Sequence, residues 1–215
     1  MHKVYFVTGK GGVGKSTMAA FFARREALLG KKTLLVEMGP WSYYQKWWGG
    51  SPVSFVPQTT AYGFEWCMWT GEDCLKEYVS YLIKVPFLSR IFLENNWMRA
   101  LTKVAPGLRE IAFLGKATSQ IREHGPKMNY DSIVVDAVST GHFLSLLQAP
   151  VGLKDMAKMG PVHEQSVDIL KALNSSSVET LLVTTLETFA VQETSLFVKD
   201  LGLKMKSQVT VLANK

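Results

Sequence analysis

The sequence predicts an α/β domain with a doubly wound, mostly parallel sheet and an inserted helical subdomain. Three observations lead to this prediction. A strand, a glycine-rich turn, a helix and a second strand follow one another within residues 3–38, and such a βαβ unit makes its sheet parallel. Strand-like and helical segments alternate again toward the C-terminus. Between these two regions, about 95 residues separate the second strand from the next one, far more than a simple crossover needs.

The first βαβ unit is indicated by residue type and spacing. Residues 3–8 (KVYFVT) are largely apolar and rich in β-forming side chains, which predicts a buried strand. A helix is expected at 15–29, and Gly30 is a suitable C-terminal cap. Residues 33–38 (TLLVEM) form the second predicted strand.

The long segment that follows carries a helical pattern. Apolar residues between 75 and 83 repeat at helical spacing, and the helical signal continues through 91–104 and 108–121. We therefore expect one domain over residues 1–215, in which approximately 41–128 includes a helical subdomain inserted before the next strand.

The C-terminal part returns to strands. Residues 132–135 are apolar and end in Asp136, and 178–185 (VETLLVTT) form a further predicted strand. A helix is expected at about 191–201, and a last strand at about 208–212.

Composition excludes several classes of protein. Apolar residues make up 47% and charged residues 20% of the chain, which is ordinary for a globular domain. No stretch approaches the roughly 18 apolar residues that span a bilayer, and Cys67 and Cys74 do not suggest a secreted disulfide scaffold. The net charge is +6, but the 24 Lys and Arg residues are scattered, which favours a polyanionic ligand site over a nucleic-acid surface. We expect a cytoplasmic protein without a membrane span and without a nucleic-acid partner.

The glycine-rich turn has the spacing of a phosphate loop. The pattern Gly-x-x-x-x-Gly-Lys-Ser is met by Gly9, Gly14, Lys15 and Ser16, between a predicted strand and a predicted helix. Glycines allow positive φ angles and bring backbone N–H groups close to phosphate oxygens. Lys15 is expected to neutralise the β and γ phosphates of ATP, and Ser16 to bind Mg²⁺. The predicted nucleotide-binding residues of this P-loop NTPase domain are Gly9, Lys10, Gly11, Gly12, Val13, Gly14, Lys15, Ser16 and Thr17.

Asp136 is the predicted acidic partner of the loop. A carboxylate at the end of a buried strand can hold the hydration shell of Mg²⁺. The alternative is a helix N-cap or a surface carboxylate. With ATP and Mg²⁺ as the expected ligands, the metal residues are Ser16 and Asp136.

The loop also resembles that of a particular group of ATPases. Lys10 adds a second lysine at its start, as in the deviant-Walker ATPases, which include partitioning ATPases and arsenite-pump ATPases. The resemblance implies that Lys10 reaches the nucleotide of a second subunit across a dimer interface, and it gives Lys10, Lys15 and Asp136 as the catalytic residues.

Other segments narrow the resemblance to one branch. Residues 136–142 (DAVSTGH) look like the second switch of the arsenite-pump and tail-anchored-protein-targeting ATPases, the ArsA-like anion-transporting ATPases. Weaker matches lie at 105–110, 144–150, 160–161 and 184–194. Asn214 stands where the asparagine of that family reads adenine.

Two departures from this family matter. Its switch Asp-Pro pair, whose Asp positions the attacking water, is replaced here by Gly39-Pro40. Glu37 lies two residues earlier and could act as a substitute. The zinc-binding Cys-x-x-Cys pair of the targeting factors is absent.

The resemblance implies a Mg-ATP-dependent dimeric switch, and the replacement of the switch Asp by Gly39 predicts that its intrinsic hydrolysis is weak. One alternative is a non-hydrolysing regulatory subunit that pairs with a paralogous ATPase, and a second is a partitioning-type ATPase. The expected partners are ATP or ADP, a second copy or a paralogue, and possible protein clients on the helical subdomain.

An aromatic cluster follows Pro40. Its members are Trp41, Tyr43, Tyr44, Trp47 and Trp48. We expect it to pack against the helical subdomain. A protein-partner surface is the main alternative, and base stacking is disfavoured because only Lys46 is interleaved with the rings.

Overall fold

The computed structural model describes residues 2–48, 52–82, 107–206 and 208–214. Its contacts divide the chain into two compact units. The sheet unit comprises Met1–Trp69, Asn129–Leu144 and Leu173–Lys215, and the helical unit comprises Thr70–Met128 and Ser145–Ala172.

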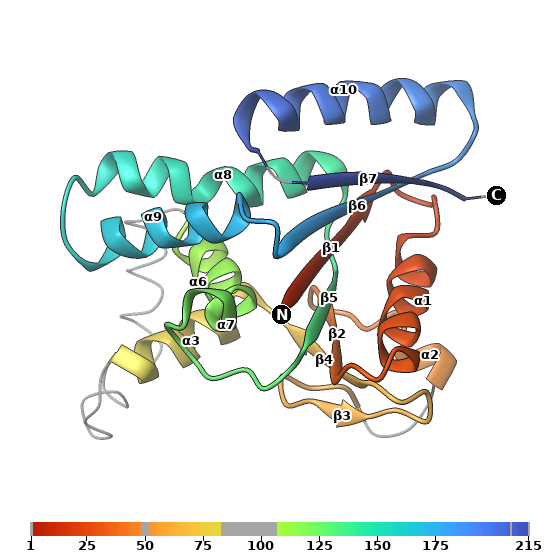
Figure 1. Ribbon diagram of the computed structural model, residues 1–215, viewed down its shortest axis with the longest axis horizontal. Coiled ribbons are helices and arrows are strands. Elements are labelled where there is room, and N and C mark those ends of the chain that lie inside the picture. Colours follow the sequence, from red (N-terminus) through yellow and green to blue (C-terminus); the bar gives the residue numbers. More distant parts are fainter. Residues whose placement is uncertain (1, 49–51, 83–106, 207, 215) are drawn as a thin grey trace. The chain divides into compact units, whose positions relative to one another are not determined.

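The sheet unit is built on a seven-stranded sheet in the order β3-β4-β2-β5-β1-β6-β7 (Figure 1). The strands are β1 Lys3–Gly9, β2 Thr33–Met38, β3 Gln58–Thr59, β4 Glu65–Trp69, β5 Ser132–Asp136, β6 Val178–Thr184 and β7 Gln208–Ala213. All neighbouring strands are parallel except β3 and β4. Parallel strands end at one edge, so the residues after β1, β2, β5, β6 and β7 lie along the same carboxyl edge, where α/β sheets bind ligands.

Three helices of the sheet unit are α1 Lys15–Leu28, α2 Gln45–Trp48 and α10 Thr188–Lys204. The helix α1 packs on β1, β2 and β5, whereas α10 packs on β6 and runs beside β7 (Figure 1). The central strands are apolar on both faces and almost wholly buried, as expected for parallel strands covered by helices.

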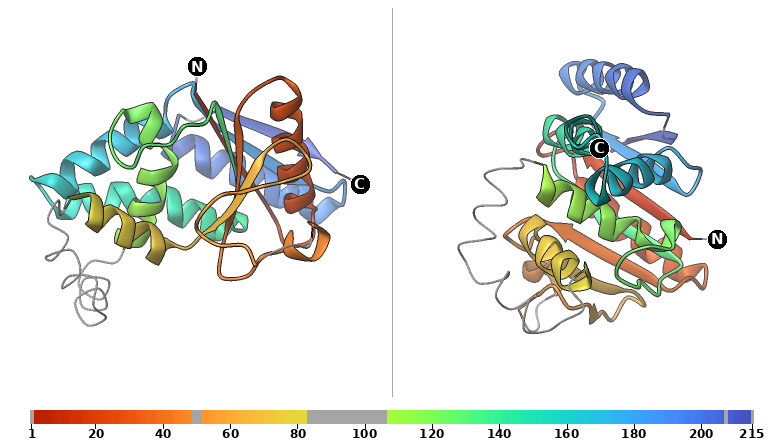
Figure 2. Two further views of the ribbon diagram at one scale, coloured as in Figure 1. Left: turned by 90° about the horizontal axis from the view of Figure 1, so that it is seen from below. Right: turned by 90° about the vertical axis from the view of Figure 1, so that its left-hand side faces the viewer.

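The helical unit contains α3 Gly71–Leu82, α6 Leu108–Ala117, α7 Ser119–Arg122, most of α8 Thr140–Met156, and α9 Pro161–Leu173 up to Ala172. Helix α3 packs against α6 (Figure 2). The buried ammonium of Lys116 on α6 lies 2.6 Å from the carboxylate of Glu77 on α3, which joins these two helices through a charge pair. Among the described helices, none is long and apolar enough to cross a membrane.

The predicted fold class is confirmed, and the strand positions agree closely with those expected. Two strands were not expected. Residues 58–59 and 65–69 lie in the stretch that was expected to include the helical subdomain, yet they pair into the sheet beside β2. The sequence EWCMW of β4 shows no clear alternation of apolar and polar residues, so its conformation depends on its pairing with β2. The helical signal at 91–104 lies outside the described residues.

Candidate nucleotide site

The phosphate loop, residues 9–17, connects β1 to the first turn of α1. Gly12 and Gly14 have φ angles of 85° and 89°, in the left-handed region that favours glycine. A Cβ atom on Gly9 would lie 2.2 Å from the carbonyl oxygen of Val183 on β6. Glycine is therefore required at these positions by backbone geometry and by the close approach of a neighbouring strand.

The outer curve of the loop is open. A Cβ atom on Gly11 or Gly12 would meet no atom within 4 Å, so the backbone there has room for a ligand group. The Lys15 ammonium donates a hydrogen bond to the Lys10 carbonyl at 3.2 Å and folds back over the loop. An open glycine backbone, a lysine and a helix N-terminus are the groups that bind phosphate.

Asp136 lies beside Ser16 at the carboxyl edge of the sheet. Its side chain is buried at the end of β5, where it accepts a hydrogen bond from the Tyr44 hydroxyl and lies near enough to the Ser16 side chain for Ser16 to affect its pKa. Burial raises the pKa of Asp136 above its usual value, while the bonds from Ser16 and Tyr44 and the charge of Lys15 act to lower it. A hydroxyl and a partly desolvated carboxylate are a donor set that suits Mg²⁺, so these residues fit the ion.

Tyr44 is a member of this site that the sequence did not reveal. Its hydroxyl lies 3.0 Å from Asp136 Oδ2 and 2.7 Å from the Ser16 carbonyl oxygen. The side chain is fully buried. Tyr44 belongs to no sequence motif for phosphate or metal binding. In the sequence it stood out only as a member of the aromatic cluster.

Glu37 anchors the segment that carries Tyr44. Its buried carboxylate accepts hydrogen bonds from the Ser42 hydroxyl at 2.5 Å, from the Trp66 indole at 3.1 Å, and from the backbone amides of Tyr43 and Tyr44. These four donors occupy both carboxylate oxygens. Glu37 therefore has a structural role here and is not placed to orient a water molecule as a substitute for the switch Asp.

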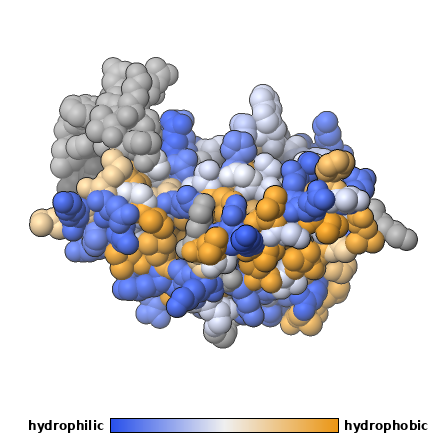
Figure 3. Space-filling view, turned by 90° about the horizontal axis from the view of Figure 1, so that it is seen from above, coloured by the Kyte–Doolittle hydropathy of each residue, from blue (hydrophilic) through white to orange (hydrophobic). Residues whose placement is uncertain are grey.

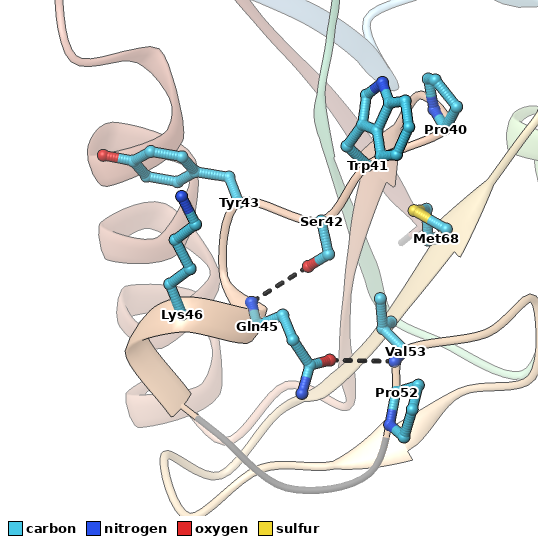
Figure 4. Close-up of a pocket in the computed structure, with 9 residues that line it drawn as sticks. All are labelled: Pro40, Trp41, Ser42, Tyr43, Gln45, Lys46, Pro52, Val53 and Met68. Carbon is cyan, nitrogen blue, oxygen red and sulfur yellow. Dashed lines mark hydrogen bonds between the residues drawn. The ribbon is translucent and has the colours of Figure 1, made fainter.

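Gly39 begins the loop between β2 and α2. It has a φ angle of 148°, and a Cβ atom there would meet nothing within 4 Å. The next residues form a hydrogen-bonded turn, in which the Gln45 amide donates to Ser42 Oγ and the Val53 amide donates to Gln45 Oε1, each at 3.0 Å (Figure 4). This turn borders an open pocket of about 580 Å³ that is lined by Pro40, Trp41, Ser42, Tyr43, Gln45, Lys46, Pro52, Val53 and Met68.

The aromatic cluster packs within the sheet unit. Tyr44 stacks on Trp48 with ring centroids 4.6 Å apart, and Trp48 meets Trp66 edge-on at 5.1 Å. The prediction that the cluster packs against the helical subdomain is therefore wrong for its two inward-facing members, because β4 joins the sheet and provides their contact surface. Trp41 remains 85% exposed.

Two further predicted residues lie on different sides of the loop. Asn214, just after β7, donates from Nδ2 to the Val13 carbonyl oxygen at 2.9 Å, so it lies against the loop backbone. The Lys10 ammonium instead lies 3.1 Å from the carboxylate of Glu193 on α10, and both side chains are about half exposed. The sequence did not predict the contribution of Glu193.

Comparison with protein families gives one match over most of the chain. The model of the anion-transporting ATPase family matches residues 2–42 and 84–214. These ranges include the phosphate loop, Asp136 and Asn214, whereas the segment with Tyr44 lies between them.

Individual relatives point the same way. The ATPase BagA of Mycobacterium tuberculosis is 32% identical over 220 residues, which cover 99% of this chain. The chain spans 65% of the length of that relative. The arsenical pump-driving ATPase of Escherichia coli is 27% identical over an alignment that covers 73% of this chain and 27% of that relative. The ATPase ASNA1 homolog 2 of Paramecium tetraurelia is 28% identical over an alignment that covers 69% of this chain and 44% of that relative.

Proposed function

This chain belongs to the anion-transporting ATPase family, and from that premise we propose that it is a Mg-ATP-binding switch with weak hydrolysis of its own. The observation that carries the proposal is the group formed by the open loop, Lys15, Ser16 and the buried Asp136 at one edge of the sheet. Relatives named as ATPases and as an arsenical pump-driving ATPase support the same class of activity.

Each residue has a definite part in this proposal. Backbone amides of the loop and the Lys15 ammonium bind the phosphates, and the N-terminus of α1 adds its dipole. Ser16 and Asp136 hold Mg²⁺, which when bound neutralises charge on the β and γ phosphates. Asn214 contacts the loop backbone next to Gly14, and in this proposal it approaches the nucleotide from the end of β7.

A direct test is calorimetric titration of the purified chain with ATP, with magnesium present and with magnesium removed by chelation. We expect saturable binding at one site per chain that is tighter with magnesium. No heat of binding under either condition would overturn the proposal.

Pairing with a second ATPase subunit is part of the proposal and rests on Lys10. Within its own chain the Lys10 ammonium forms an exposed ion pair with Glu193 on α10. It can therefore leave this carboxylate and bind a phosphate of a second subunit. Glu193 shares a helix face with Phe189 and Leu196, which are 76% and 63% exposed. Figure 3, which views the side of the molecule at the top of Figure 1, shows hydrophobic residues interspersed among hydrophilic ones. Exposed apolar patches favour association.

We expect nucleotide-dependent pairing to respond in opposite ways to changes in these two residues. Lys10→Ala removes the charge that reaches the second nucleotide and should weaken pairing in a non-hydrolysable ATP analogue. Glu193→Gln frees Lys10 from a competing carboxylate. An exposed ion pair contributes up to about 1 kcal/mol, so pairing should strengthen by up to about fivefold. Sedimentation velocity measures both effects.

The matched control is Lys171→Ala, which breaks an exposed ion pair with Asp168 on α9 and should leave pairing unchanged. A strict monomer in every nucleotide state, alone and with a paralogous ATPase, would contradict the pairing proposal. Weakening by Glu193→Gln would instead assign Glu193 itself to the interface.

A regulatory subunit of a heterodimer is the second candidate function. The observation in its favour is that Gly39 offers no side chain and that Glu37 is fully engaged by other donors. Under this candidate the chain binds Mg-ATP without turning it over, and the paralogue supplies the water-positioning carboxylate. Turnover by the mixture but by neither subunit alone distinguishes it from the first candidate.

A further inference from the structure

The Asp136 carboxylate lies against the Tyr44 hydroxyl. The hydroxyl is 3.0 Å from Asp136 Oδ2 and 2.7 Å from the Ser16 carbonyl oxygen, so its one proton is shared between these two acceptors. A carboxylate offers about four lone-pair sites on two oxygens. The contact with Tyr44 occupies one of these sites, restricts the rotation of the carboxylate and leaves its other oxygen for a metal ion.

Tyr44 is well suited to a fixed position. Its ring is fully buried, lies parallel to Trp48 within 7°, and meets the edge of Trp66 at a centroid distance of 6.5 Å. Its backbone amide is bound to Glu37 at 3.3 Å. Burial, together with the neighbouring Asp136, raises the pKa of Tyr44 well above its usual value, so the hydroxyl keeps its proton.

We propose that Tyr44 is a positioning residue for the magnesium site, whose hydroxyl orients the Asp136 carboxylate toward Ser16 and the phosphate loop. The inference rests on the proposed function, since it concerns the same Mg-ATP site. Groups that hydrogen-bond a metal-binding side chain orient it, and their loss typically weakens metal affinity or activity by about 10- to 100-fold.

The same contact ties the loop after Gly39 to the metal site. Tyr44 points inward to Asp136, whereas its neighbours Ser42, Tyr43 and Gln45 line the open pocket (Figure 4). The backbone of this segment is fastened to Glu37, which pairs in register with Asp136 on the adjacent strand. One rigid set of hydrogen bonds therefore holds both the loop and the carboxylate.

The test separates magnesium binding from nucleotide binding. Affinity for ADP is measured by calorimetry with magnesium and with chelator, in the wild type and in Tyr44→Phe, which keeps the ring and removes only the hydroxyl. We expect Tyr44→Phe to reduce the magnesium-dependent gain in affinity by about 10-fold and to leave magnesium-free affinity close to wild type. Tyr43→Phe is the matched control, because Tyr43 is half exposed and should leave the gain unchanged.

A double-mutant cycle tests whether Tyr44 acts through Asp136. In the Asp136→Asn background, Tyr44→Phe should have no further effect on the magnesium-dependent gain. An unchanged gain in Tyr44→Phe alone, or an equal loss of affinity with and without magnesium, would overturn the inference. If the wild type binds ADP equally well without magnesium, the inference fails while nucleotide binding stands. Absence of any nucleotide binding would instead reject the proposed function.

Discussion

Gly39→Asp is expected to raise the rate of ATP hydrolysis by about 10²- to 10⁴-fold over a slow wild type, because it restores a carboxylate that orients the attacking water. The loop, Lys15, Ser16 and Asp136 provide phosphate binding and charge stabilisation, but Gly39 provides no side chain. The position has space for one, since no atom lies within 4 Å of an added Cβ.

The backbone sets a limit on this gain. Gly39 has a φ angle of 148°, where side-chain-bearing residues are rare, and such strain costs of the order of 1–3 kcal/mol. Gly39→Asn carries the same strain without a carboxylate and is the matched control. Steady-state phosphate release from the purified chains measures the effect.

The expected order is a fast Gly39→Asp variant and slow Gly39→Asn and wild-type chains. A wild type that already turns over at about 1 per second or faster, with no gain from Gly39→Asp, would place the water-positioning group elsewhere. Residues 41–46 would then be the next to test, since Glu37 is engaged by four donors.

Lys15→Ala should reduce Mg-ATP affinity by about 100-fold or more. A hydrogen bond to a charged group contributes about 1.5–3 kcal/mol, and about 1.4 kcal/mol corresponds to a tenfold change in affinity. Lys15 is proposed to face two phosphates, so both contributions are lost together. Calorimetry with Mg-ATP measures the loss.

Lys32→Ala is the control for net charge. Lys32 precedes β2 at the amino edge of the sheet, away from the phosphate loop, and its removal should leave affinity unchanged. Unchanged affinity in Lys15→Ala would reject residues 9–17 as the phosphate site. An equal loss in both variants would indicate long-range electrostatic attraction in place of a direct contact.

Much of the fold could be read from local sequence. The segment β1–α1–β2 and the strand that ends in Asp136 depend on apolar runs, glycine positions and helix-start residues, all of which act over a few neighbours. The phosphate loop was predictable for the same reason, since Gly12 and Gly14 adopt left-handed backbone angles that favour glycine within the loop itself. By contrast, β4 is short, lacks alternation, and becomes a strand through its pairing with β2.

The sequence by itself determined the parallel α/β class, the phosphate loop with its paired lysines, and Asp136 at the end of a buried strand. The tertiary structure alone decided that Tyr44 meets Asp136 across 92 positions of sequence, that Glu37 anchors the intervening loop, and that Lys10 meets Glu193. The physical reason is strand order. Because β5 is inserted between β2 and β1, the residues after β2 come to lie beside the carboxylate of β5, and no local periodicity encodes which strands become neighbours.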